Sequence, residues 1–95
     1  MTISPSQCRA ARALVDMDQA VLAEGAKVSR NTIVDFEKGR RTPTTNNLAA
    51  IRSTLEATGV EFIAENGGGP GVRLKKPRPD PDSIAAEDLN ANNDE

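Results

Sequence analysis

Apolar residues recur three or four positions apart in four segments of the first 58 residues, and this spacing predicts four amphipathic helices. A polar residue able to cap a helix precedes each segment, as expected where a helix begins. The four caps are Ser4, Asp18, Ser29 and Thr44. The side chains expected to face inward are Cys8, Ala11, Leu14, Val15, Val21, Leu22, Ala26, Ile33, Phe36, Leu48, Ile51 and Leu55.

Local chemistry sets the expected bounds of the first two helices. The stretch SPSQ at residues 4–7 is typical of a capping box with proline in the first turn. The helix that follows is expected to end near Val15. The second helix is expected to be short, from Gln19 to about Gly25.

Glycine and proline mark the expected ends of the third and fourth helices. Gly39 is expected to end the third helix in a left-handed conformation. Pro43 prevents direct continuation of that helix, and Gly59 stops the fourth. A mainly α bundle of four to five helices is therefore expected over residues 1–58.

A change of pattern after residue 59 predicts a β-hairpin. Residues 60–64 and 72–76 alternate in character around a glycine-rich break at 67–71. An isolated hairpin is marginal in water, so it must pack on the helices or pair with a second copy. The favoured hypothesis is a shared sheet across a two-fold axis. The residues expected at this dimer contact are Val60, Phe62, Val72 and Leu74.

The chain is thus expected to have three parts. Residues 1–58 form the helical domain, and residues 59–76 form the hairpin as a dimerisation element. Residues 77–95 are spaced by prolines and then acidic, which is typical of a disordered tail.

Composition excludes several classes of active site. The chain of 95 residues is one small domain, or one domain with appendages. It has no histidine and one cysteine, Cys8, which excludes His-based acid–base catalysis, Ser-His triads and multi-cysteine metal sites. No carboxylate pair, nucleophile–base set or phosphate loop emerges, so no enzyme activity, cofactor or metal is expected. Cys8 is predicted to be a small core residue.

Two absences in the sequence bear on where the protein acts. No run approaches the roughly 18 apolar residues that a membrane helix needs. The opening residues also lack the apolar core of a signal peptide. A cytoplasmic protein without membrane contact is therefore expected.

The net charge of −2 hides an uneven distribution along the chain. Residues 1–58 hold eight Lys/Arg and six Asp/Glu, and residues 59–76 hold three and two. Residues 77–95 hold one Lys/Arg and six Asp/Glu, a net charge of −5. Because the acidity lies in the tail, the rest of the chain remains compatible with nucleic-acid binding.

The stretch VSRNTIVDFEKGRRTP, residues 28–43, carries the chemistry of a DNA reader. A tight turn joins the second and third predicted helices, which is helix-turn-helix geometry. In such a unit the start of the second helix meets base edges in the major groove. The residues expected to read bases are Ser29, Arg30, Asn31, Thr32 and Asp35. The alternative is ordinary capping plus a solvated helix face.

Each of these residue types has a known partner in DNA. Arg30 can contact guanine bidentately and Asn31 can contact adenine in the same way. Asp35 can accept a hydrogen bond from cytosine N4, or instead hold Arg30 in its rotamer. Arg40 and Arg41 follow the helix and suit phosphate contacts, which position a protein without reading sequence.

The stretch RAARALVDMDQAVLAEGAKVSRNTIVDFEKGRRTPTTNNLAAI resembles the Cro/C1-type (XRE) helix-turn-helix family of repressors, over roughly residues 7–58. The matching elements are Gln19, Leu22-Ala23, VSRNTI, FEKGRRTP and the helix that carries Leu48 and Ile51. The resemblance implies that Gln19 binds a DNA phosphate and that Arg12 forms a structural salt bridge with Glu37. The full set expected at phosphates is Gln19, Lys27, Lys38, Arg40 and Arg41.

Two positions depart from the family pattern. Lys27 stands where the family usually has glycine, because that turn residue tends to adopt positive φ. Asp18 is the second departure, and its carboxylate either points away from DNA or weakens the phosphate contact expected at Gln19. Apart from these two departures, Val34 is expected to be exposed at the groove edge.

The function expected from these features is that of a sequence-specific regulator of transcription. It is expected to bind double-stranded DNA as a dimeric repressor. One alternative is an antitoxin-like repressor whose acidic tail binds a protein toxin. Another is a protein–protein adaptor that keeps the fold without binding DNA.

Overall fold

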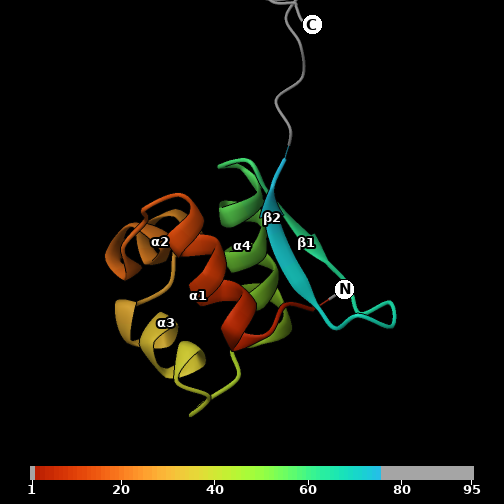
Figure 1. Ribbon diagram of the computed structural model, residues 1–95. Coiled ribbons are helices and arrows are strands. Elements are labelled where there is room, and N and C mark those ends of the chain that lie inside the picture. Colours follow the sequence, from red (N-terminus) through yellow and green to blue (C-terminus); the bar gives the residue numbers. More distant parts are fainter. Residues whose placement is uncertain (1, 76–95) are drawn as a thin grey trace, which may run out of the picture.

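The computed structural model describes residues 2–75, which form four helices followed by a two-stranded antiparallel sheet (Figure 1). The elements are α1 (Pro5–Leu14), α2 (Gln19–Ala26), α3 (Arg30–Glu37), α4 (Thr45–Glu56), β1 (Val60–Ile63) and β2 (Gly71–Leu74). This arrangement confirms the mainly α fold with a hairpin, with four helices among the described residues. The tail expected over 77–95 lies outside them.

Each helix begins at the polar residue predicted to cap it. At the start of α1, the Ser4 hydroxyl accepts from the Gln7 backbone N–H at 3.1 Å, and the Gln7 side chain accepts from the Ser4 N–H at 2.8 Å. This reciprocal pair is the predicted capping box. The caps of α2, α3 and α4 each accept one backbone N–H of the first turn; they are Asp18, Ser29 and Thr44.

Three helices end in the same way, with a left-handed residue followed by a backbone bond that reaches back five positions. The left-handed residues are Asp16, Lys27 and Gly39, with φ of 54°, 60° and 75°. The bonds run from the N–H of Met17, Val28 and Arg40 to the carbonyls of Arg12, Ala23 and Asp35, at 2.9, 3.0 and 2.8 Å. Gly39 was predicted from its residue type and Lys27 from the resemblance, whereas Asp16 was not anticipated.

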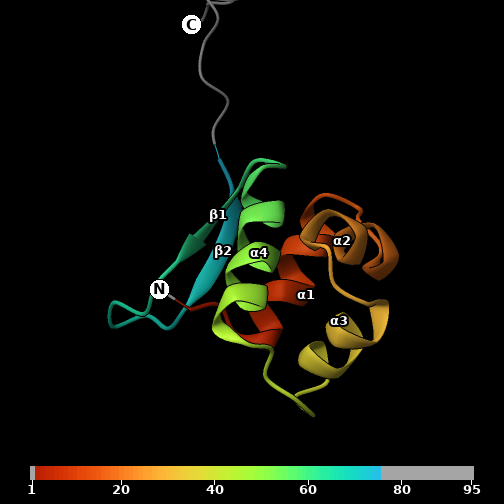
Figure 2. The same ribbon diagram turned by 180° about the vertical axis from the view of Figure 1, so that it is seen from behind.

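A single core of mostly aliphatic side chains joins the helices and the hairpin. In Figures 1 and 2, α4 lies between α2 on one side and the hairpin on the other. The buried apolar residues are Ile3, Cys8, Ala11, Leu22, Ala23, Ala26, Ile33, Phe36, Leu48, Ile51, Leu55, Val60 and Phe62. The hairpin therefore shares the core of the helical part.

Two apolar side chains that were expected to face inward are exposed. Leu14 is 42% exposed and Val21 is 51% exposed. Leu14 is the last residue of α1, and the chain turns away from the helix axis at Asp16. In α2 the inward face holds Leu22 and Ala26, four positions apart, and Val21 lies about 100° around the helix from Leu22.

Gly25 lies in the last turn of α2, which ends at Ala26, one residue beyond the approximate bound that was expected. A methyl group added at Gly25 would lie 2.6 Å from Cγ2 of Thr54 on α4. The absence of a side chain therefore lets α2 and α4 approach closely. This close approach packs α2 directly against α4.

The strands pair in the register Val60–Leu74, Glu61–Arg73, Phe62–Val72 and Ile63–Gly71. Cross-strand partners point to the same face of a sheet, and here Val60 and Phe62 are buried against the helices. The second strand begins one residue earlier than expected. Lys75 extends the ladder with a 2.7 Å bond from its N–H to the Gly59 carbonyl.

The buried Gln7 side chain holds the hairpin to α1. Its Nε2 donates to the Gly71 carbonyl at 2.8 Å and to the Ile63 carbonyl at 3.3 Å. These bonds join residues more than fifty positions apart, so sequence reasoning that saw Gln7 only as a cap missed them. The hairpin is thus supported within one chain.

This support removes the original reason for placing the hairpin in a dimer. Val60 and Phe62 are occupied in the core of their own protomer, so their side chains are not free to contact a second copy. Val72 packs against that core and is half-buried. Among the four residues expected at the dimer contact, Leu74 alone is largely exposed.

We expect Gln7→Ala to loosen the hairpin, because it removes the side-chain bonds from α1 to the carbonyls of Gly71 and Ile63. The cost in the free energy of unfolding should be about 1–3 kcal/mol. Amide hydrogen exchange of both strands should accelerate more than that of α4. The control is Ser4→Ala, which removes the cap but keeps the Gln7 side chain, and should leave strand exchange unchanged relative to the helices.

We expect Lys27→Gly to raise the free energy of unfolding by up to about 1 kcal/mol in urea denaturation. Glycine relieves the left-handed strain, worth about 1–2 kcal/mol, and this exceeds its extra freedom in the unfolded chain, worth about 0.5–1 kcal/mol. Ala49→Gly, at an exposed position inside α4, is the control and should lower stability by about 1 kcal/mol. A loss of stability in both variants would contradict the strain at Lys27.

Candidate nucleic-acid interface

The unit formed by α2 and α3 lies on the side of the molecule away from the hairpin (Figures 1 and 2). Residues 27–29 join the two helices. Lys27 turns the chain through its left-handed conformation, and Ser29 then caps α3. This is the predicted helix-turn-helix arrangement, and it leaves the start of α3 at the surface.

The side chains at the start of α3 divide into two kinds. Ser29 and Thr32 engage each other: the Ser29 hydroxyl accepts from the Thr32 N–H at 3.1 Å and lies 2.9 Å from the Thr32 hydroxyl. Arg30 and Asn31 are exposed and have no hydrogen-bond or ion-pair partner among residues 2–75. Of the four residues expected to read bases here, these two are therefore available to an external ligand.

Asp35 pairs with Arg40 instead of holding Arg30. Its carboxylate lies 3.8 Å from the Arg40 guanidinium, and both side chains are on the surface. Val34, expected to be exposed at the groove edge, is half-buried instead. Its position beside Ile33 on a helix packed against α1 and α2 accounts for this burial.

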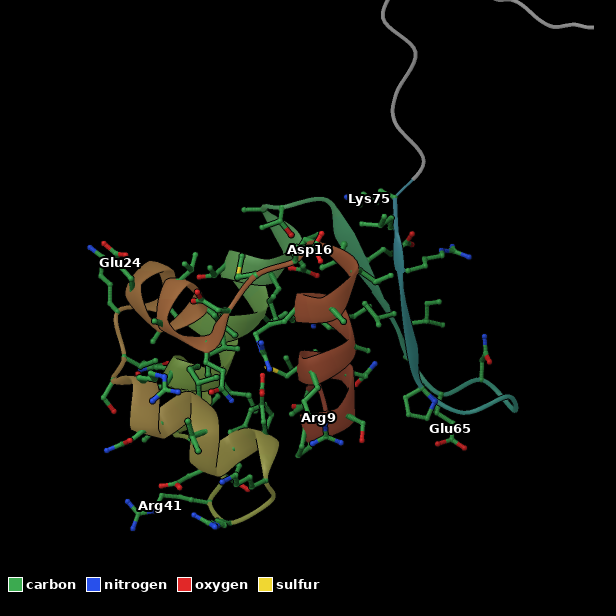
Figure 3. All side chains as sticks on the ribbon, turned by 60° about the vertical axis from the view of Figure 1, so that its left-hand side comes forward. Arg9, Asp16, Glu24, Arg41, Glu65 and Lys75 are labelled. Atoms are coloured by element: carbon green, nitrogen blue, oxygen red, sulfur yellow. The ribbon has the colours of Figure 1, made fainter. Side chains whose placement is uncertain are left out.

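The cations expected at phosphates lie around the two ends of α3. Lys27 precedes the helix, and Lys38, Arg40 and Arg41 follow it; all four side chains are exposed. Figure 3 shows Arg41 beside the end of α3 with its side chain pointing away from the molecule. Exposed positive charge therefore lies at both ends of α3.

The start of α2 is more engaged with the protein than expected. The Gln19 side-chain amide donates to Glu37 Oε1 at 3.0 Å, which leaves it one further N–H and its oxygen for other partners. The Asp18 carboxylate accepts from the Val21 N–H at 2.9 Å. The Asp18 carboxylate is therefore occupied as a helix cap.

Behind the surface of α3, the buried Glu37 carboxylate gathers donors from α1 and α2. The Arg12 guanidinium donates to both of its oxygens, at 2.7 Å each, which is the salt bridge that the resemblance implied. The Cys8 thiol donates to Oε2 at 3.1 Å, and Gln19 donates to Oε1. Sequence reasoning missed the last two donors, because nothing local connects them to Glu37.

The protonation states in this cluster follow from its geometry. Burial raises the pKa of Glu37, but the hydrogen bonds from Arg12, Cys8 and Gln19 outweigh it and hold the pKa below its ordinary value. The hydrogen bond to Glu37 raises the pKa of Arg12. Burial, and then the neighbouring carboxylate, raise the pKa of the Cys8 thiol. Cys8 is thus a protonated core residue that acts as a donor.

A second arginine of α1 also holds the end of α3. Arg9, labelled in Figure 3, donates to the backbone carbonyl of Glu37 and, at 3.1 Å, to the Ser6 hydroxyl. A cation is favourable at the carbonyl end of a helix, where the helix dipole is negative. Together Arg9 and Arg12 fix α3 against α1 from two sides.

The geometry is that of a DNA-binding helix-turn-helix regulator. The model of the Cro/C1-type (XRE) helix-turn-helix family matches residues 9–62, more than half of the chain, and the chain belongs to this family. None of the curated proteins compared with the chain matches it.

Two further findings concern the described residues 2–75. No group of acidic residues and cysteine in this part of the chain is arranged to hold a metal ion. No helix in it has the length and apolar character needed to cross a bilayer.

We expect Glu37→Ala to lower the free energy of unfolding by about 3–5 kcal/mol, because it leaves the Arg12 guanidinium partly buried without its counter-ion. Thermal unfolding followed by circular dichroism gives the midpoint. The control is Arg73→Ala, which breaks the exposed ion pair with Glu61 on the hairpin and should cost at most about 1 kcal/mol. Equal midpoints for the two variants would reject a structural role for Glu37.

The same cluster makes the free energy of unfolding depend on pH in the acidic range. Glu37 has a lowered pKa in the folded protein, so its contribution is fully present above the unfolded-state pKa of about 4.3. That contribution is lost as the pH falls through the lowered folded-state pKa. Glu37→Gln, which keeps the shape of the side chain, should flatten this part of the pH–stability curve. A curve parallel to that of the wild type would contradict the assignment.

Proposed function

We propose that this protein is a sequence-specific repressor of transcription that reads the major groove with the start of α3. The observation that carries the proposal is the pair Arg30 and Asn31, adjacent, exposed and without a protein partner among the described residues. Unpaired side chains that bind guanine and adenine through two hydrogen bonds each are the groups that direct readout needs.

The surrounding charges support this docking. Lys27, Lys38 and Arg41 are exposed near the two ends of α3, where the phosphate backbones flank a helix in the major groove. Gln19 approaches a phosphate with the groups that Glu37 leaves free.

A dimer is part of the proposal, because one helix-turn-helix unit reads few base pairs. Two copies would place their recognition helices on half-sites about 34 Å apart. Leu74 is the exposed apolar residue of the hairpin, beside the half-buried Val72, and is the best candidate for the contact. Light scattering at tens of micromolar that finds only a monomer would reject this part of the proposal.

An antitoxin-like repressor is a second candidate, favoured by the charge of the tail. Residues 77–95 carry a net charge of −5, which suits a segment that folds on a basic partner. DNA reading would remain the task of Arg30 and Asn31. Copurification of a small basic protein with the full chain, but not with a chain ending at residue 76, would support this candidate.

We expect Arg30→Ala combined with Asn31→Ala to abolish specific DNA binding without loss of stability, because both side chains are exposed. Fluorescence anisotropy with DNA from upstream of the gene and excess random competitor measures this directly. The affinity of the wild type for the upstream DNA should fall steeply with salt. The variant should bind the upstream DNA no more tightly than it binds random DNA.

The control for this experiment is Arg73→Ala, which removes an exposed arginine of the hairpin. It changes the net charge as Arg30→Ala does, so it separates loss of base contacts from loss of charge. Wild-type binding that is weak and equal on random DNA would reject sequence reading.

A further inference from the structure

Two carboxylates lie in the last turn of α3, where the negative end of the helix dipole disfavours them. Each of them is compensated by an arginine. Glu37 is buried and bonded to Arg12, which fixes α3 to α1. Asp35 is at the surface and pairs with Arg40, which follows the helix. The second pair has no evident role in packing.

The backbone brings Asp35 and Arg40 together. Gly39 adopts φ of 75°, its N–H bonds to the Phe36 carbonyl at 3.0 Å, and the Arg40 N–H bonds to the Asp35 carbonyl at 2.8 Å. In this helix ending, the side chains at the positions of Asp35 and Arg40 meet, and they are often both apolar. Here they are a carboxylate and a guanidinium, 3.8 Å apart.

The pair adds little to folding, since 35% of the Asp35 side chain and 64% of the Arg40 side chain are exposed. Its location indicates a different role. Asp35 follows Asn31 by four positions, so both lie on one face of α3. The Asp35 carboxylate therefore lies on the face of α3 that is proposed to contact DNA.

We propose that Asp35 and Arg40 form one specificity-determining unit, in which Asp35 selects a cytosine through its N4 amino group and Arg40 compensates the charge of the carboxylate. This inference rests on the proposed function. A lone carboxylate is repelled by the phosphates and loses hydration in the groove. The arginine beside it lowers both penalties. A base that presents an acceptor at this point faces the carboxylate oxygen with another acceptor and is rejected.

Arg41 is the natural comparison. It is the next residue, its side chain is exposed, and it has no ion pair among the described residues. It therefore represents a cation that contacts phosphate alone. Arg40 and Arg41 would act alike if both were simple phosphate contacts.

The first test is selection of bound sequences from a random double-stranded DNA pool, with the wild type and with Asp35→Ala. The wild type should enrich a cytosine at one position of each half-site. Asp35→Ala should lose that preference by roughly tenfold and keep the others, while its binding to random DNA strengthens. An unchanged preference in Asp35→Ala overturns the inference but leaves the proposed function in place. A wild type that enriches no sequence rejects both.

The second test is a double-mutant cycle on the selected DNA. In the wild-type background, Arg40→Ala should weaken binding more than Arg41→Ala does. In the Asp35→Ala background, the two substitutions should weaken binding by the same factor. Arg41→Ala should add independently to Asp35→Ala. Additivity of Arg40→Ala with Asp35→Ala would overturn the unit. Thermal midpoints within the error of the wild type, expected for these exposed positions, show that the variants are folded.

Discussion

The orientation of α3 depends on one buried carboxylate. Glu37 is 3% exposed, and a buried charge of this kind is tolerated only where donors surround it. Arg12 and Cys8 supply those donors from α1, and Gln19 supplies one from the start of α2. Both α1 and α2 are therefore positioned by Glu37, the last residue of α3. The contacts on the buried side of α3 therefore fix the direction in which its exposed face points.

The first helix links the two ends of the molecule. At its start, Gln7 holds the turn-proximal ends of both strands, and further along Arg9 and Arg12 hold the end of α3. Because a helix is stiff, a contact made at the hairpin and a contact made at DNA are connected by a rigid path. A dimer built on the hairpin, as proposed, would therefore hold its two copies of α3 at a defined separation.

Sequence patterns predicted the caps, the helix faces around Ile33 and Phe36, and the hairpin, because these depend on spacing and on neighbours along the chain. They also placed Arg30 and Asn31 at an exposed helix start. The tie made by Gln7 joins residues far apart in sequence, and local rules do not reach it. Pairing of Asp35 with Arg40 escaped for another reason: it requires the backbone path through the helix ending, which residue types alone do not reveal.

Cys8 gives this fold an intrinsic probe of its own motions. It is the single cysteine of the chain, it is fully buried, and burial raises the pKa of its thiol. A thiol reagent attacks the thiolate, so modification requires α1 to separate from α3 and expose the sulfur. The rate of labelling under native conditions therefore reports how often that junction opens. A ligand bound at the exposed face of α3 would therefore slow the labelling of Cys8 without contacting it.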